Sequence, residues 1–200
     1  MPSVDRTTYS TDEQQALLRI AFDAIRHGLH TRHAPPAIEA THYPLTLQQS
    51  AACFVTLTLG GELRGCIGSL QAHRPLVADV AANAHAAAFR DPRFAPLSAL
   101  ELTHIDCHIS ILGPPQPMCF DSEAGLLHQL RPGIDGLILE EAGGQRATFL
   151  PAVWASLPTP ALFVQQLKLK AGLSVSHWSA TLRAWRYQTH GFEGQFPADY

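Results

Sequence analysis

The stretch "CFVTLTLGGELRGCIG", residues 53–68, decides the fold, because it reads as two strands joined by a turn. Residues 53–59 alternate, with Phe54, Thr56 and Thr58 between the other side chains, and are rich in branched residues, which predicts a strand. Gly60-Gly61 then predicts a turn, and residues 62–68 predict a second strand. The stretch is therefore expected to form a β-hairpin.

The length of the turn decides which side chains share a face of this hairpin. A two- or four-residue loop would place Val55 and Leu57 on the face of Arg64 and Cys66. A three-residue loop, Leu59-Gly60-Gly61, places them instead with Leu63, Gly65 and Ile67. We expect the three-residue loop, because one face then becomes uniformly apolar and the other carries Arg64 and Cys66 together.

The elements outside the hairpin alternate between helices and further strands. The sequence predicts a helix from the Ser10/Glu13 capping box to about 28–33, a helix from about Pro75 to about Phe89, a strand over 105–111, a short helix from Asp121 or Ser122 to about Leu130, a hairpin of 136–140 with 145–150, a helix from Thr159-Pro160 to Gly172 and a strand over 182–189. Hairpins separated by helices, without strict β-α-β alternation, indicate an α+β fold with a mainly antiparallel sheet and flanking helices. We expect one domain over residues 11–190, with a flexible tail over 1–10 and a second tail over 191–200.

Composition and charge exclude several classes of protein. The 200 residues carry a formal net charge of −3 and no long run of Lys or Arg, so no nucleic-acid partner is expected. No stretch approaches the roughly 18–20 apolar residues that span a bilayer, and the first residues lack the layout of a signal peptide. The four cysteines form no C-x-x-C pair and no zinc-ribbon spacing, which favours reduced thiols in a cytoplasmic protein. Dinucleotide, Walker, nucleophile-elbow and H-E-x-x-H motifs are lacking, so no cofactor is expected.

Arg64-Gly65-Cys66 with Gly68 is the first candidate for chemistry. A thiol beside a guanidinium can act as a thiolate with a lowered pKa, and therefore as a nucleophile. The two glycines would let a ligand approach the backbone closely. The alternative is structural: Cys66 is then a small buried hydrophobic residue, and the glycines are packing or bulge positions.

The helix expected over residues 75–89 supplies a second set of candidates. Asn83 and His85 project from a surface of small residues and suit the wall of a ligand pocket, while Asp91 and Arg93 follow just after the helix. For Asp91 we favour a structural role in the turn, and for Arg93 a surface ion pair. His85 has no visible partner that would make it a general base.

The segment "HIDCH" contains the residues for a weak metal-site hypothesis. On a strand, His104, Asp106 and His108 would share one face, and two imidazoles with a carboxylate can form an open metal site. A half-buried strand with a wet polar face is the alternative, and no fourth ligand with convincing spacing is evident. We therefore favour the alternative.

Several motifs together resemble one family. "ELRGCIG", "RPL", "AAFRDPRF", "ISIL", "GLILE" and "FLPAVW" occur in this order between about residues 12 and 190, and this pattern is similar to the AMMECR domain family. The family's six-residue signature, L-R-G-C-I-G, stands intact as Leu63 to Gly68. Bacterial members are often labelled AmmeMemoRadiSam system protein A.

The resemblance implies an α+β fold with a larger lobe, a smaller lobe and a cleft between them near the signature. It implies no established activity. The bacterial label implies a shared pathway or complex with a Memo-like protein and a radical SAM protein. Many relatives carry Glu where this chain has His108, so the resemblance does not support a required carboxylate there.

Two functional hypotheses follow. In the first, the protein binds or transforms a small anionic molecule near the LRGCIG signature, with Arg64 as the anion anchor and Cys66 as nucleophile, redox group or close contact. In the second, it is a non-catalytic partner of a Memo-like or radical SAM protein, and the signature shapes a docking surface. The sequence shows no acid/base constellation, so no enzyme class is assigned.

Overall fold

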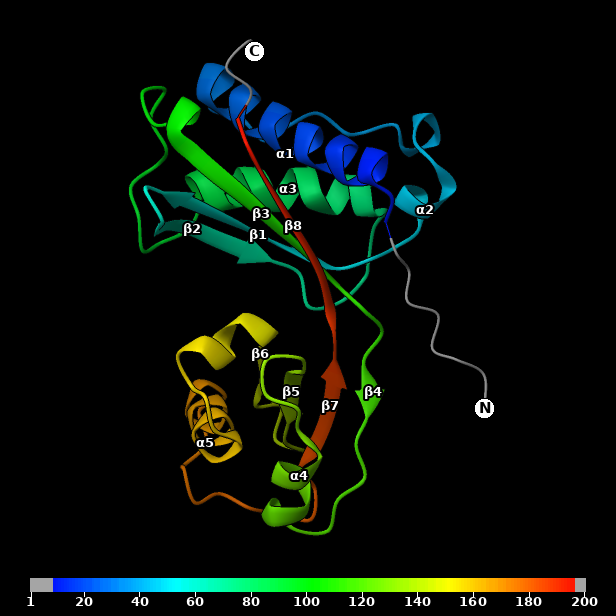
Figure 1. The fold of residues 1–200 in the computed structure, drawn as a ribbon, viewed down its shortest axis with the longest axis vertical. Helices are drawn as coiled ribbons and strands as arrows, with labels where there is room; N and C mark the ends of the chain where they lie inside the picture. The colour runs from blue at the N-terminus through cyan, green and yellow to red at the C-terminus, as the bar shows by residue number, and fades with distance from the viewer. Residues whose placement is uncertain (1–8, 197–200) are drawn as a thin grey trace. The chain divides into compact units, whose positions relative to one another are not determined.

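Two separate hydrophobic cores divide the chain into two units, each described here by itself. The structure, a computed structural model, describes residues 9–196. Unit 1 comprises residues 9–112 together with 190–196, and unit 2 comprises Gly113–Thr189. Both units combine antiparallel strands with helices (Figure 1), so the α+β expectation is confirmed.

Unit 1 is built on a four-stranded sheet with the order β2-β1-β3-β8. Strand β1 pairs antiparallel with both β2 and β3. Helices α1 and α3 cover one face of this sheet (Figure 1). The elements are α1 (Thr11–Thr31), η1 (Ala40–His42), α2 (Leu45–Gln48), β1 (Cys53–Leu59), β2 (Glu62–Gly68), α3 (Leu76–Phe89), η2 (Leu102–His104), β3 (Ile105–Leu112) and β8 (Thr189–Gln195).

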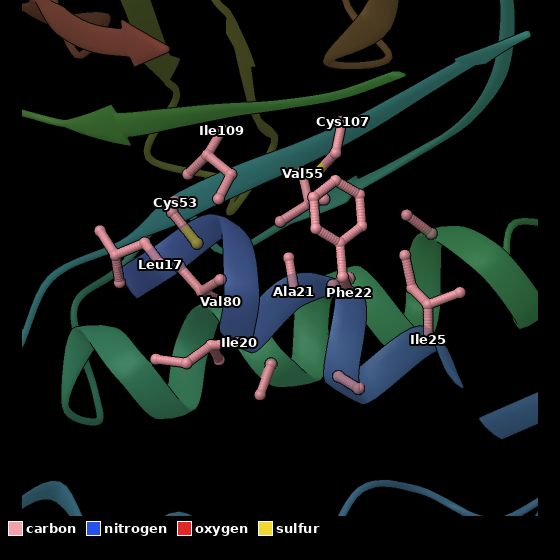
Figure 2. Packing of buried hydrophobic residues seen from close by; sticks show 14 of the residues in the cluster. Leu17, Ile20, Ala21, Phe22, Ile25, Cys53, Val55, Val80, Cys107 and Ile109 are labelled. Atoms are coloured by element: carbon pink, nitrogen blue, oxygen red, sulfur yellow. The ribbon is translucent and has the colours of Figure 1, made fainter. Parts of the chain in front are cut away.

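The core of unit 1 lies between the helices and the sheet (Figure 2). Helix α1 begins at the expected capping box, in which the Ser10 hydroxyl accepts from the Glu13 amide and the Glu13 carboxylate accepts from the Ser10 amide. Its apolar stripe then packs against the alternate residues of β1 and β3 that point toward the helices. The labelled core residues are Leu17, Ile20, Ala21, Phe22, Ile25, Cys53, Val55, Val80, Cys107 and Ile109.

The turn of the first hairpin differs from the expectation. Leu59 pairs with Glu62, so the loop has two residues, Gly60 and Gly61, both at positive φ (60° and 84°). Two consecutive residues at positive φ form the tight turn that suits the twist of a hairpin, and glycine adopts this conformation without steric cost. The predicted three-residue loop is wrong for this reason.

A bulge restores the predicted face assignment farther along the hairpin. Leu57 pairs with Gly65 whereas Thr58 pairs with Leu63, which leaves Arg64 as the extra residue. Beyond the bulge, Val55 faces Ile67, as predicted. Leu63 is instead 42% exposed, so its predicted place on the apolar face is wrong.

Unit 2 holds a smaller sheet with the order β4-β7-β5-β6. Trp154 stacks on Phe163 of α5 with ring centres 3.9 Å apart, and this pair belongs to the core of the unit. The elements are β4 (Gln116–Pro117), α4 (Glu123–Gln129), β5 (Gly136–Glu140), β6 (Arg146–Phe149), η3 (Pro151–Ala155), α5 (Pro160–Lys170) and β7 (Arg183–Tyr187). Every helix and strand expected between 121 and 189 is present, with small shifts of the ends.

The ends of the chain require one correction. The predicted tail over 191–200 is wrong over 191–195, because these residues belong to β8, the edge strand beside β3. Residues 197–200, like residues 1–8 of the predicted first tail, lie outside the described part. Tyr9 is buried in the core of unit 1 and Ser10 is the N-cap of α1.

Within residues 9–196, none of the helices combines the length and apolar character that a membrane crossing requires.

Candidate functional site

The backbone of Cys66 is held by an acidic side chain at the free edge of the sheet. Strand β2 is an edge strand, and the Cys66 amide donates to Asp91 Oδ2 at 2.9 Å instead of to another strand. Asp91 is buried and also accepts from the Arg93 amide at 3.1 Å and from the Arg93 guanidinium at 2.7 and 2.9 Å. The hydrogen bonds from Arg93 hold the pKa of Asp91 well below its usual range. The Asp91–Arg93 segment therefore caps the edge that a strand would otherwise occupy.

The Cys66 thiol points to the side of the sheet away from the core. Its cross-strand partner Thr56 donates from Oγ1 to Sγ at 3.2 Å. Cys66 is half-buried, whereas Cys53 and Cys107 are buried in the core of unit 1. Burial raises the pKa of both core thiols, that of Cys107 to about 12. Of the three thiols in unit 1, only that of Cys66 is open to a reagent or a ligand.

Arg64 is tied to an acidic side chain that sequence reasoning did not identify. Its Nε donates to Glu101 Oε1 at 2.6 Å and its Nη2 to Oε2 at 3.3 Å. The same contact lowers the pKa of Glu101 to about 2. The third nitrogen, Nη1, is buried and has no hydrogen-bond acceptor within residues 9–196. A buried donor without an acceptor costs about 1–3 kcal/mol, so this nitrogen is the unsatisfied atom of the site.

An aromatic ring joins the two arginines of the site. The Arg64 guanidinium lies 6.0 Å from the centre of the Phe94 ring, and that of Arg93 lies 5.4 Å from it. Cations favour such positions at an aromatic ring. The Arg93 side chain is 54% exposed, so one of the two guanidinium groups remains accessible to solvent.

Packing accounts for both glycines of the signature. A Cβ on Gly65 would meet the backbone carbonyl of Ala87 near the end of α3. A Cβ on Gly68 would fall on the ring of Phe54. Close contacts within the fold therefore already require glycine at both positions. A part of these glycines in ligand binding stays a prediction.

Asn83 and His85 lie on α3 but have other partners than the signature. The Asn83 amide group donates to the Cys53 carbonyl and to Asp79 Oδ2, each at 3.0 Å, inside a buried polar network. His85 is buried, its ring lies 5.0 Å from that of Phe89, and burial lowers its pKa. None of these contacts within the described residues brings either side chain to Arg64 or Cys66.

The three residues of the metal hypothesis do not share one strand. His104 belongs to η2, and its Nδ1 lies 3.2 Å from the Leu100 carbonyl. Asp106 and His108 do lie on β3, and the His108 ring lies over Gly191 of β8. Within residues 9–196, no group of three or more His, Cys, Asp and Glu side chains is placed to hold a metal ion.

Sequence reasoning missed Glu101 and Phe94 and recognised the role of Asp91 only in part. Phe94 had a local signal, since it directly follows Arg93 in "DPRF". Glu101 had none, because 37 residues separate it from Arg64.

Comparisons with known proteins agree with this architecture. The family model described as AMMECR1 matches residues 18–192. A protein of Methanothermobacter thermautotrophicus is 36% identical over 185 residues, which is 92% of this chain and 95% of that protein. A protein of Thermotoga maritima is 35% identical over 148 residues, which is 73% of this chain and 79% of that protein. The crystal structure of an uncharacterized protein from Pyrococcus horikoshii superposes with a TM-score of 0.81 at 28% identity and covers 91% of both chains. The chain belongs to the AMMECR1 family.

Proposed function

We propose that the protein binds a small anionic molecule, with a carboxylate or phosphate group, beside the LRGCIG segment (Leu63–Gly68). The observation that carries the proposal is Arg64 Nη1, a buried donor that lacks an acceptor among the described residues, 9–196. Arg64 and Arg93 both lie at the Phe94 ring, so an anion there would meet two guanidinium groups. The acceptor oxygen of such a ligand would satisfy Nη1 and remove the cost of the unmade hydrogen bond.

Cys66 is our candidate for the reacting group at this site. Its backbone is fixed by Asp91, and its half-buried thiol receives a hydrogen bond from Thr56. A fixed thiol beside a bound anion suits nucleophilic or redox chemistry, or a close contact that sets specificity.

The experiment uses a variant that keeps the charge but removes the guanidinium group. Arg64→Lys leaves one ammonium group opposite Glu101, so it loses Nη1 together with one of the two hydrogen bonds to Glu101. The matched control is Arg131→Lys, since Arg131 also pairs with a carboxylate, that of Asp135, at 2.6 Å in unit 2. Phosphate and malonate are titrated by calorimetry against the wild type and both variants. We expect saturable binding to the wild type, at least fivefold weaker binding to Arg64→Lys and no change in Arg131→Lys.

A second readout keeps the test decisive if Arg64→Lys does not fold. In the wild type, a bound anion should slow the alkylation of Cys66 while that of exposed Cys119 stays constant. The proposal is refuted if neither anion binds saturably, or if the two lysine variants bind alike.

A specific observation also favours the docking hypothesis as a second candidate. Leu63 is 42% exposed and Leu100 is 87% exposed. The residues that follow them in the chain, Arg64 and Glu101, form an ion pair that joins the two segments. We propose that these two leucines contact a Memo-like or radical SAM partner. Co-purification with such a partner should be lost in Leu63→Ser/Leu100→Ser and kept in Leu45→Ser, where Leu45 is a 75% exposed leucine of α2. Equal losses would count against the docking surface, and a complex retained in Cys66→Ala would show that the thiol is not part of it.

A further inference from the structure

Unit 1 contains a pocket that shares no residue with the LRGCIG segment. It has a volume of about 450 Å³ and lies between α1, the segment 35–43 and Ala81 of α3. This volume falls in the range of small-molecule sites, which is about 300–1,000 Å³. Three residues of the lining are apolar and buried, namely Ile20, Ala24 and Ala81.

The two walls of the pocket differ in chemistry. The wall formed by the segment 35–43 is apolar and aromatic, and Tyr43 supplies its ring. The α1 wall is polar, because Asp23, His27 and His30 follow at i, i+4 and i+7 and therefore share one helix face. A molecule between these walls would place an apolar surface on one side and a polar edge on the other.

The hydrogen bonds of the polar wall show which groups a ligand would meet. Arg26 Nη2 donates to Asp23 Oδ1 at 2.7 Å, so the guanidinium charge is offset within the wall. His30 Nδ1 lies 2.8 Å from the Arg26 carbonyl oxygen. Because a carbonyl oxygen only accepts, this contact favours the tautomer with the proton on Nδ1, in which Nε2 is an acceptor. The Asp23 carboxylate is also an acceptor, and within residues 9–196 only Arg26 donates to it.

We propose that this pocket binds a planar aromatic heterocycle that carries an amino group. The ring would lie against Tyr43 and the apolar wall, where flat aromatic surfaces are removed from water. The amino group would donate to His30 Nε2 or to the Asp23 carboxylate. A ligand without the amino group would leave these two acceptors without its donor.

The experiment compares two probes that differ by one amino group. Adenine and unsubstituted purine are titrated into the full chain labelled with 15N, and amide shifts are followed by NMR. We expect adenine to give saturable amide shifts at residues 20–30 and 37–43 and to bind at least fivefold more tightly than purine. Contacts from the adenine ring protons to the Ala81 methyl group would place it in the pocket.

Two histidine variants test the assigned acceptor. His30→Leu should weaken adenine binding at least fivefold and should fold, since His30 is exposed. His73→Leu is the matched control, because His73 is also exposed and its Nδ1 also lies at a backbone carbonyl, that of Gln71, at 2.9 Å. The inference fails if adenine gives no saturable shifts, binds no better than purine, or responds equally to the two variants.

Discussion

Gly65→Ala tests how closely the signature strand is packed against α3. A Cβ at residue 65 would lie 3.0 Å from the carbonyl carbon of Ala87 and closer still to its oxygen. The carbonyl oxygen is the closer atom and sets the required shift, so β2 and the end of α3 would have to separate by about 1 Å or more to restore an ordinary contact. The obstacle is backbone, which cannot rotate away as a side chain can.

The size of the effect follows from two opposing contributions. Overpacking of this kind costs typically about 1–3 kcal/mol. Gly65 has no positive φ, so alanine fits the backbone and returns about 0.4–1 kcal/mol by restricting the unfolded chain. We expect a net loss of about 1–2 kcal/mol in the free energy of unfolding of unit 1.

The control is a glycine in the same sheet that faces a movable group. A Cβ at Gly191 would lie 2.8 Å from Nε2 at the end of the half-buried His108 ring, which can turn aside. We expect Gly191→Ala to cost less than about 1 kcal/mol.

The assay has to report on unit 1. Trp154, Trp178 and Trp185 all lie in unit 2, so tryptophan emission does not follow unit 1. Urea unfolding is therefore followed by far-UV circular dichroism, with emission as an internal measure of unit 2. The packing argument is refuted if Gly65→Ala unfolds within about 0.5 kcal/mol of the wild type, or like Gly191→Ala.

Three further predictions concern other parts of the molecule. Iodoacetamide should label Cys119 first, Cys66 second, and Cys53 and Cys107 only after unfolding, because the core thiols are buried. The order is measured by mass spectrometry, and a core thiol labelled before Cys66 would contradict the assignment of the accessible thiol. Asn83→Ala should lower the free energy of unfolding of unit 1 by about 1–3 kcal/mol, because the Cys53 carbonyl and Asp79 lose a buried donor. Urea unfolding followed by circular dichroism measures this loss, and an unchanged midpoint would show that the polar network around Asn83 is dispensable. Hydrogen bonds from Ser179, Thr181 and His177 lower the pKa of Glu141 from 4.5 to about 2, so its contribution to stability is complete above pH 4.5 and is lost as the pH falls toward 2. The urea midpoint of unit 2, followed by tryptophan emission, should therefore decrease when the pH is lowered from 6 to 3. An equal decrease in Glu141→Gln would refute the assignment.

Features with a local cause could be predicted from the sequence. The capping box of Ser10 and Glu13 begins α1, and the alternation over residues 53–59 forms β1. The "DPRF" segment ends α3 near Phe89 because the residue before proline resists the helical conformation. Each of these outcomes depends on residues within a few positions of one another.

Features with a distant cause required the tertiary structure. The apolar pattern favoured the wrong loop length for the first hairpin, because a bulge at Arg64 lets a two-residue turn keep the apolar face. Residues 191–195 lacked a clear strand pattern, and β8 forms there because β3 offers an edge to pair with.

The site shows the same division. That a thiol and a guanidinium lie close together in the chain was readable from Leu63 to Gly68. Which atoms they meet was decided by contacts over long separations: Glu101 with Arg64, Asp91 with the Cys66 amide, and Ala87 with Gly65. Such contacts depend on how α3 and the segment after it fold back onto the edge of the sheet, and no short-range pattern encodes that arrangement.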